Sequence, residues 1–200
     1  MATSDVAIAN LALTKLGDLR ITALTDNTKP ARELNAIYGM LRDKLQRTYN
    51  WRFCVKRAQL AADVAAPLYE WTTQYTVPAD CLRILQINSY FPAPDLSDLI
   101  SSGGQEYVLE GGKILTRSSG QLNLRYLARI SDTTRFDPSF DDAFASLLAY
   151  NVCEALTQSD AKKNAALRDY RMAVMDAVKS NAIENPPESL ADTTWLTVRL

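Results

Sequence analysis

Two amphipathic patterns open the chain and predict two helices. Four apolar residues of the first pattern recur at the spacing of one helical face: Val6, Ala9, Leu13 and Leu16. Thr3 or Ser4 is suited to cap the start of this helix, and Gly17 is suited to end it. A second helix is predicted after Asp26-Asn27-Thr28, with Pro30 tolerated in its first turn. Its apolar stripe consists of Leu34, Ile37, Tyr38, Leu41, Leu45 and Tyr49.

After Ala66-Pro67 the spacing changes to the two-residue alternation that is typical of strands. One side of the alternating segment is aromatic or β-branched: Tyr69, Trp71, Thr73, Tyr75 and Val77. Pro78 ends this predicted strand, and Leu82–Ile87 forms a second short apolar run. The pattern therefore predicts a sheet with one buried face.

A hairpin is predicted next. Tyr107–Leu109 and Ile114–Thr116 are apolar runs that flank the sequence Glu110-Gly111-Gly112-Lys113, whose glycines supply the positive φ of a tight turn. Leu122, Leu124 and Tyr126 alternate with polar residues and predict a further strand. The segment from about residue 68 to 130 is therefore predicted to be antiparallel β structure.

Helical spacing returns at Asp137-Pro138-Ser139. The apolar side of the first of two further helices is Phe140, Phe144, Leu147, Leu148, Val152 and Leu156; that of the second is Leu167, Tyr170, Val174 and Val178. From Glu184-Asn185-Pro186-Pro187-Glu188 the periodicity is lost. The sequence predicts an α+β fold, in which residues 1–67 and 131–183 form an antiparallel helical bundle. Residues 68–130 form a small inserted antiparallel β lobe, and residues 184–200 an extended C-terminal tail.

The overall charge bears on binding to nucleic acid. The net charge is -1, the sequence pI is about 5.5, and basic residues are mixed with acidic ones along the chain. Non-specific DNA binding requires clustered Lys and Arg, so the composition disfavours it. The rival interpretation is a DNA-binding helical module that uses Arg32, Arg42, Lys44 and Arg47. No signal peptide and no apolar run long enough to span a membrane is expected.

Residues that carry catalytic or metal chemistry are scarce. The chain has no histidine, which removes the commonest near-neutral base and metal ligand. Cys54, Cys81 and Cys153 are far apart and show no Cys-x-x-Cys spacing, so they are interpreted as small hydrophobic residues in a reducing compartment. The glycine pairs lack the Lys-Ser or Lys-Thr of a phosphate loop. The prediction is a non-enzyme with no catalytic residue, cofactor or metal site.

Paired carboxylates leave one enzymatic alternative open. Two Asp or Glu residues can carry out glycoside hydrolysis, and the candidates are Asp141 with Asp142 and Glu106 with Glu110. Adjacent helical positions diverge by about 100°. Asp141 and Asp142 are therefore interpreted mainly as favourable charges at a helix start. A cell-wall or polysaccharide hydrolase remains the alternative function.

The apolar C-terminal tail is explained poorly by packing within the predicted bundle. It follows a Pro-Pro linker and ends Trp195-Leu196-Thr197-Val198-Arg199-Leu200. Two interpretations stay open: the tail packs back on its own domain, or it binds another chain as an added strand or an aromatic anchor.

Several of these motifs, in the same order, resemble the tail tubular protein A and head-completion adaptor family of short-tailed bacteriophages. The matching segments are "ALTKLGDLRITALTD", "RELNAIYGMLRDKLQRTYNWRFCVKR", "WTTQYTVPADCLRILQI", "LRYLARISDTTRFDPSFDDAFASLLA" and "TTWLTVRL". The residues that carry the likeness are Leu16-Gly17, Ile21, Leu24, Arg42-Asp43, Trp51, Phe53, Pro78, Asp80, Cys81, Leu82 and Arg83. The resemblance spans nearly the whole chain and carries no catalytic motif.

The resemblance implies a structural virion protein at the head–tail junction, made in the host cytoplasm. It implies a homo-oligomeric ring of about twelve subunits between the portal protein and the tail nozzle protein. Double-stranded DNA would pass through the lumen without sequence-specific binding, and no membrane is involved. The implied portal-binding residues are Trp195, Leu196, Val198, Arg199 and Leu200, and the implied nozzle-binding residues are Glu110, Gly111, Gly112 and Lys113.

Overall fold

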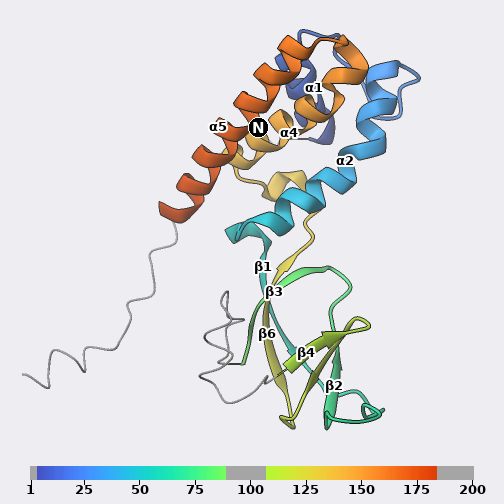
Figure 1. Ribbon diagram of the computed structural model, residues 1–200, viewed down its shortest axis with the longest axis vertical. Helices are drawn as coiled ribbons and strands as arrows, with labels where there is room; N and C mark the ends of the chain where they lie inside the picture. The colour runs from blue at the N-terminus through green and yellow to red at the C-terminus, as the bar shows by residue number, and fades with distance from the viewer. Residues whose placement is uncertain (1–3, 89–106, 184–200) are drawn as a thin grey trace, which may run out of the picture.

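The computed structural model describes residues 4–88 and 107–183 (Figure 1). These residues form four α-helices: α1 (Asp5–Leu16), α2 (Lys29–Thr48), α4 (Pro138–Thr157) and α5 (Asp160–Ile183). One antiparallel sheet has the order β1 (Val55–Leu60), β6 (Leu122–Ala128), β3 (Cys81–Ile87). The other has the order β2 (Thr73–Thr76), β5 (Lys113–Thr116), β4 (Tyr107–Glu110). The predicted combination of helices and antiparallel strands is confirmed.

The ends of the helices are set by local capping. The Ser4 hydroxyl accepts a hydrogen bond from the Ala7 N–H at the start of α1, and Gly17 ends this helix with a left-handed φ of 71°. Thr28 and Asp137 cap α2 and α4 in the same way, each followed by a proline in the first turn. The boundaries predicted at Ser4, Gly17 and Thr28 are confirmed.

Helix α4 is the centre of the helical region and contacts α1, α2 and α5. Its predicted apolar side is buried, except that Leu156 is only half-buried. Beside its first turn lies an aromatic cluster composed of Trp51, Phe53, Phe136 and Phe140, with neighbouring ring centroids 4.9–6.2 Å apart. The cluster lies where the chain leaves α2 for the strands. None of the helices in residues 4–88 and 107–183 is long and apolar enough to cross a bilayer.

The two sheets together make the β region, which lies at the opposite end of the molecule from most of the helices (Figure 1). Its first strand, β1, lies within residues 1–67, the segment predicted to belong to the helical bundle. That prediction is corrected for residues 55–60, which pair with β6 from Val55↔Leu127 to Leu60↔Leu122. The sequence of β1, VKRAQL, has no regular alternation of apolar and polar residues that would predict a strand. Its strand structure depends instead on pairing with β6, which is far along the chain.

The strand predicted across Tyr69–Val77 is shorter in the structure. Only Thr73–Thr76 forms β2, which pairs with β5. Glu70 has a positive φ of 64°, which breaks the extended backbone just before the strand. The alternation therefore continues into a segment that has no partner strand to pair with.

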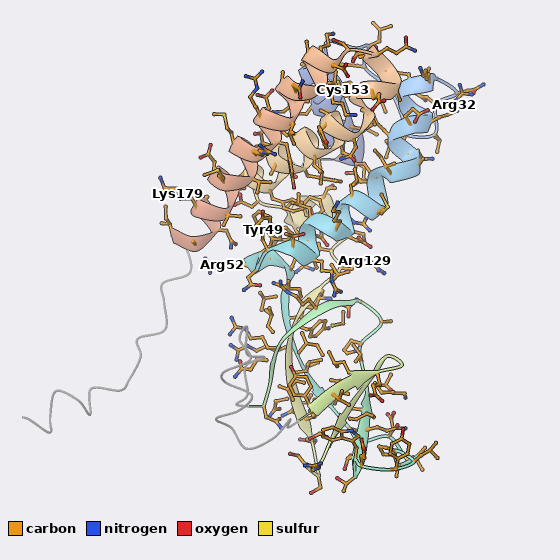
Figure 2. All side chains as sticks on the ribbon, in the orientation of Figure 1. Arg32, Tyr49, Arg52, Arg129, Cys153 and Lys179 are labelled. Carbon is orange, nitrogen blue, oxygen red and sulfur yellow. The ribbon has the colours of Figure 1, made fainter. Side chains whose placement is uncertain are left out.

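Polar contacts from the last part of α2 fix the β region to the helices. Gln46 is fully buried, and its side-chain amide donates to the Ile130 carbonyl (2.8 Å) and accepts from the Ile130 N–H (3.0 Å). Arg129, which lies at the junction in Figure 2, forms an ion pair with Asp43 at 2.6 Å. Arg47 donates to the Leu82 carbonyl. Buried residues of both regions form one continuous core, so the two regions are packed as a unit.

Candidate functional site

The predicted nozzle-binding residues form the turn of the β4–β5 hairpin. Gly111 and Gly112 have φ values of 56° and 77°, which confirms the predicted role of the glycines in a tight turn. Glu110, Gly111 and Gly112 are exposed, and Lys113 is half-buried. The Gly112 carbonyl accepts a hydrogen bond from the Val77 N–H at 3.1 Å. The turn is therefore held against the end of β2.

Lys113 is bound within the chain. Its ammonium group lies 2.6 Å from the Asp63 carboxylate and 2.7 Å from the Thr76 hydroxyl. The hydrogen bond from Lys113, with a further one from Thr76, holds the pKa of Asp63 below its usual value. These contacts tie the hairpin to the start of the loop between β1 and β2.

That loop, residues 61–72, is the distal loop: it lies at the end of the β region farthest from the helices (Figure 1). It exposes three large apolar side chains: Val64 is fully exposed, Leu68 is 98% exposed and Tyr69 is 75% exposed. Trp71 at the end of the loop is half-buried, with the Arg117 guanidinium 5.2 Å from its ring centroid. The middle of the loop thus exposes large apolar side chains, whereas Asp63 and Trp71 near its two ends contact Lys113 and Arg117.

Sequence reasoning missed the distal loop, because it assigned Tyr69 and Trp71 to the buried face of a strand. The sequence feature that could have indicated the loop is Pro67, because a proline disfavours a continuous strand. Leu68 and Tyr69 lie between this proline and Glu70, which has a positive φ.

Of the two candidate carboxylate pairs, only Asp141 with Asp142 lies fully within the described residues, and its two side chains are in different surroundings. Asp141 is buried at the start of α4, whereas Asp142 beside it forms an ion pair with Lys15 of α1 at 2.8 Å. Glu110 is in the β region, and Glu106 lies outside the described residues. Asp141 and Asp142 thus do not form the facing pair that glycoside hydrolysis requires, and the pair Glu106 with Glu110 stays untested.

The cysteines are buried or half-buried, and all three are free thiols. Burial raises the pKa of Cys54 to about 12 and that of Cys81 to about 11. These two groups are therefore poor nucleophiles at neutral pH. Within the parts of the chain that the structure describes, no three His, Cys, Asp or Glu side chains gather to hold a metal ion.

The basic residues of the rival DNA-binding helix are spread along α2 rather than gathered into one patch. Arg42 forms an ion pair with Asp43 at 2.8 Å, and Arg47 is used at the junction with the β region. Arg32 is near the other end of α2 and donates to the Asn27 side chain. Lys44 is exposed. Three of the four residues are thus engaged within the chain.

The predicted portal-binding residues Trp195, Leu196, Val198, Arg199 and Leu200 lie outside the described residues, as does the whole predicted tail, residues 184–200. Their role stays a prediction.

No protein-family model matches this chain, and no curated protein matches it.

Proposed function

We propose that this chain is a non-enzymatic structural protein of the virion, a ring-forming adaptor that joins the portal to the tail nozzle of a short-tailed bacteriophage. The observation that carries the proposal is the distal loop, which exposes Val64, Leu68 and Tyr69 at the end of the β region. Apolar groups placed this way favour contact with a second protein. The order of sequence motifs shared with the adaptor family supports the identity of that protein as the nozzle.

In this proposal the distal loop makes the main apolar contact with the nozzle. Burying one large apolar side chain is worth about 1.5–3 kcal/mol, so three of them would supply a substantial part of the binding free energy, which must also offset the cost of association. The hairpin residues Glu110, Gly111, Gly112 and Lys113 lie beside the loop through the Lys113–Asp63 ion pair. They would supply the polar rim of the same interface.

Lateral contacts in a closed ring require two different faces of the subunit, because a heterologous interface joins unlike surfaces. Helices α2 and α5 lie on opposite sides of the helical region, with α4 between them (Figure 1). Each carries exposed methionines: Met40 on α2, and Met172 and Met175 on α5. Methionine adapts to irregular apolar surfaces. We assign these two faces to contacts between neighbouring subunits.

The remaining parts of the proposal follow the family resemblance. The four helices act as an antiparallel bundle that forms the body of a ring of about twelve subunits. The portal-binding residues of this proposal are Trp195, Leu196, Val198, Arg199 and Leu200, which could serve as an apolar-aromatic anchor. Double-stranded DNA passes through the lumen. The firm junction around Gln46 and Arg129 would transmit force between the portal side and the nozzle side.

Replacing the three exposed large apolar residues of the distal loop tests the nozzle contact. The variant V64S/L68S/Y69S is expected to fold normally and to bind the purified nozzle protein roughly 100-fold more weakly, because it loses the apolar centre of the interface. Isothermal titration calorimetry measures the affinity. The matched control L19S/I183S removes exposed apolar side chains from the helical region and is expected to bind the nozzle as the unmodified chain does. Equal affinity of the loop variant and the control would remove the distal loop from the interface.

A further inference from the structure

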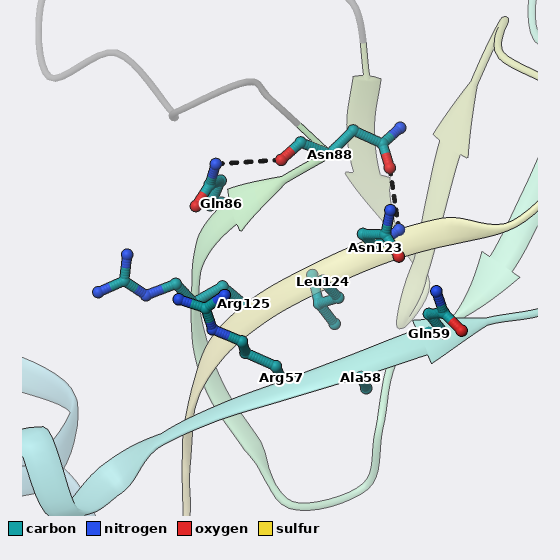
Figure 3. A pocket seen from close by; sticks show the side chains of 8 residues that line it. All are labelled: Arg57, Ala58, Gln59, Gln86, Asn88, Asn123, Leu124 and Arg125. Carbon is teal, nitrogen blue, oxygen red and sulfur yellow. Dashed lines mark hydrogen bonds between the residues drawn. The ribbon is translucent and has the colours of Figure 1, made fainter. Parts of the chain in front are cut away.

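The outward face of the β1-β6-β3 sheet forms an open polar groove of about 430 Å³ (Figure 3). Its polar lining consists of Arg57, Gln59, Gln86, Asn88, Asn123 and Arg125. We call it the arginine groove. The apolar residues of β6, Leu122, Leu124 and Tyr126, are buried, as the two-residue alternation of a strand requires. The groove is thus a polar sheet surface above a well-packed core.

Two arginines lie directly opposite each other in this groove. Arg57 of β1 is the cross-strand partner of Arg125 of β6, and Gln86 of β3 is the partner of Arg125 on its other side. Figure 3 shows both guanidinium groups extending to the same side of the groove. Like charges placed opposite each other in a sheet are destabilising. The arrangement therefore lowers stability unless an anion lies between the two groups.

Neither arginine has an acidic partner among the residues that the structure describes. The ion pairs of the β region involve Lys56 with Asp80 and Lys113 with Asp63, and neither includes Arg57 or Arg125. The Nε atom of Arg125 is buried and has no hydrogen-bond partner within residues 4–88 and 107–183. A buried donor without an acceptor is unfavourable, so this atom also favours an oxyanion in the groove.

Asn88 makes the rim of the groove rigid. Its N–H donates to the Asn123 carbonyl at 2.7 Å, and its side-chain oxygen accepts from the Asn123 N–H at 2.9 Å. These two hydrogen bonds hold Asn88 at a positive φ of 51°. Gln86 donates to the Asn88 carbonyl at 3.0 Å. The backbone that presents the polar side chains is therefore fixed before any ligand binds.

We propose that the arginine groove binds phosphate groups of a duplex DNA backbone. Arginine, asparagine and glutamine side chains commonly donate hydrogen bonds to backbone phosphates and sugars, and the arginine guanidinium can bind a phosphate through two N–H groups. Among the residues that the structure describes, the lining has no aromatic ring on which an unpaired base could stack. It also offers no pocket for an apolar peptide side chain, since Leu124 is buried and Ala58 is small. All of the described lining residues belong to one chain.

An NMR titration of the full chain with a duplex DNA of about 16 bp tests this site. The Arg57 and Arg125 side-chain resonances and the β6 amides are expected to shift. The affinity is expected to fall about 12-fold between 50 and 200 mM salt, as two phosphate contacts require. The variant R57Q/R125Q is expected to lose about 10-fold or more in affinity at 50 mM salt and nearly all of the salt dependence. It should still fold, because the substitution removes a like-charge pair.

The control R168Q/R171Q removes the same charge from two exposed arginines of α5 and is expected to bind within about 2-fold of the unmodified chain. Equal DNA binding by R57Q/R125Q and this control would overturn the proposal, as would the absence of any shift in the groove. Tighter binding of a polyglutamate peptide of equal charge would also overturn it, by identifying an acidic protein segment as the occupant. A groove variant that still binds the nozzle but not DNA separates this site from the adaptor function.

Discussion

Replacing Phe140 with alanine is expected to lower the free energy of unfolding by about 3–5 kcal/mol, because it removes a large aromatic ring from the centre of the core. Phe140 is 0% exposed. Its ring centroid lies 5.0 Å from those of Trp51 and Phe136, 4.9 Å from that of Phe53 and 6.0 Å from that of Phe144. A cavity at this position is bounded by several large rings that cannot all move to fill it.

Urea unfolding followed by tryptophan fluorescence measures this effect. Y69A is the matched control, because Tyr69 is 75% exposed and the change in stability should stay within about 0.5 kcal/mol. A loss of less than about 1 kcal/mol for F140A would show that the aromatic cluster does not stabilise the helical core as described.

The second large effect is expected at Gln46, where leucine keeps the side-chain volume but removes both hydrogen bonds to Ile130. Gln46 and Ile130 are both buried, so the Ile130 N–H and carbonyl would be left without partners. Each unsatisfied group costs about 1–3 kcal/mol, and the added apolar surface of leucine offsets part of this. We expect Q46L to lose about 2–4 kcal/mol of unfolding free energy.

Hydrogen exchange gives a local readout of the same contact. The Ile130 amide is expected to exchange faster in Q46L by a larger factor than core amides of α4, because the junction opens before the helices unfold. Q121L, at an exposed position of the β region, serves as the control and should leave both stability and exchange unchanged. Unchanged exchange at Ile130 in Q46L would contradict the role of Gln46 at the junction.

The features that could be predicted from the sequence are those with local causes. Ser4, Thr28 and Gly17 mark helix ends through contacts within one turn, and Gly111-Gly112 marks the hairpin because few other residues tolerate positive φ there. The long apolar stripe of α4 is equally local, since helical spacing alone identifies it. These predictions required no knowledge of distant partners.

The features that could not be predicted depend on contacts between distant segments. Strand β1 exists because β6 pairs with it, and nothing in the sequence Val55–Leu60 specifies that partner. The same register places Arg57 opposite Arg125, so the arginine groove is invisible until the pairing is known. The alternation across Tyr69–Val77 indicates a strand, but only Thr73–Thr76 finds a partner in β5.

The hairpin was predicted from the sequence, and the role of its residues in binding stays a prediction. The hairpin residues Glu110, Gly111 and Gly112 are exposed as an interface requires, whereas Lys113 is bound to Asp63. The apolar residues beside the hairpin, in the distal loop, were assigned to a strand instead. Exposure of Leu68 and Tyr69 follows from the three-dimensional path of the chain rather than from its hydropathy.

The most direct test of the adaptor function is native mass spectrometry of the full chain mixed with purified portal rings. We expect a single discrete complex in which one portal ring carries a closed ring of about twelve copies of this chain. The assembly should appear at lower concentration than any ring of the chain alone, because binding to the portal stabilises the assembled ring. Portal rings that remain free of this chain at every concentration would contradict the proposed function.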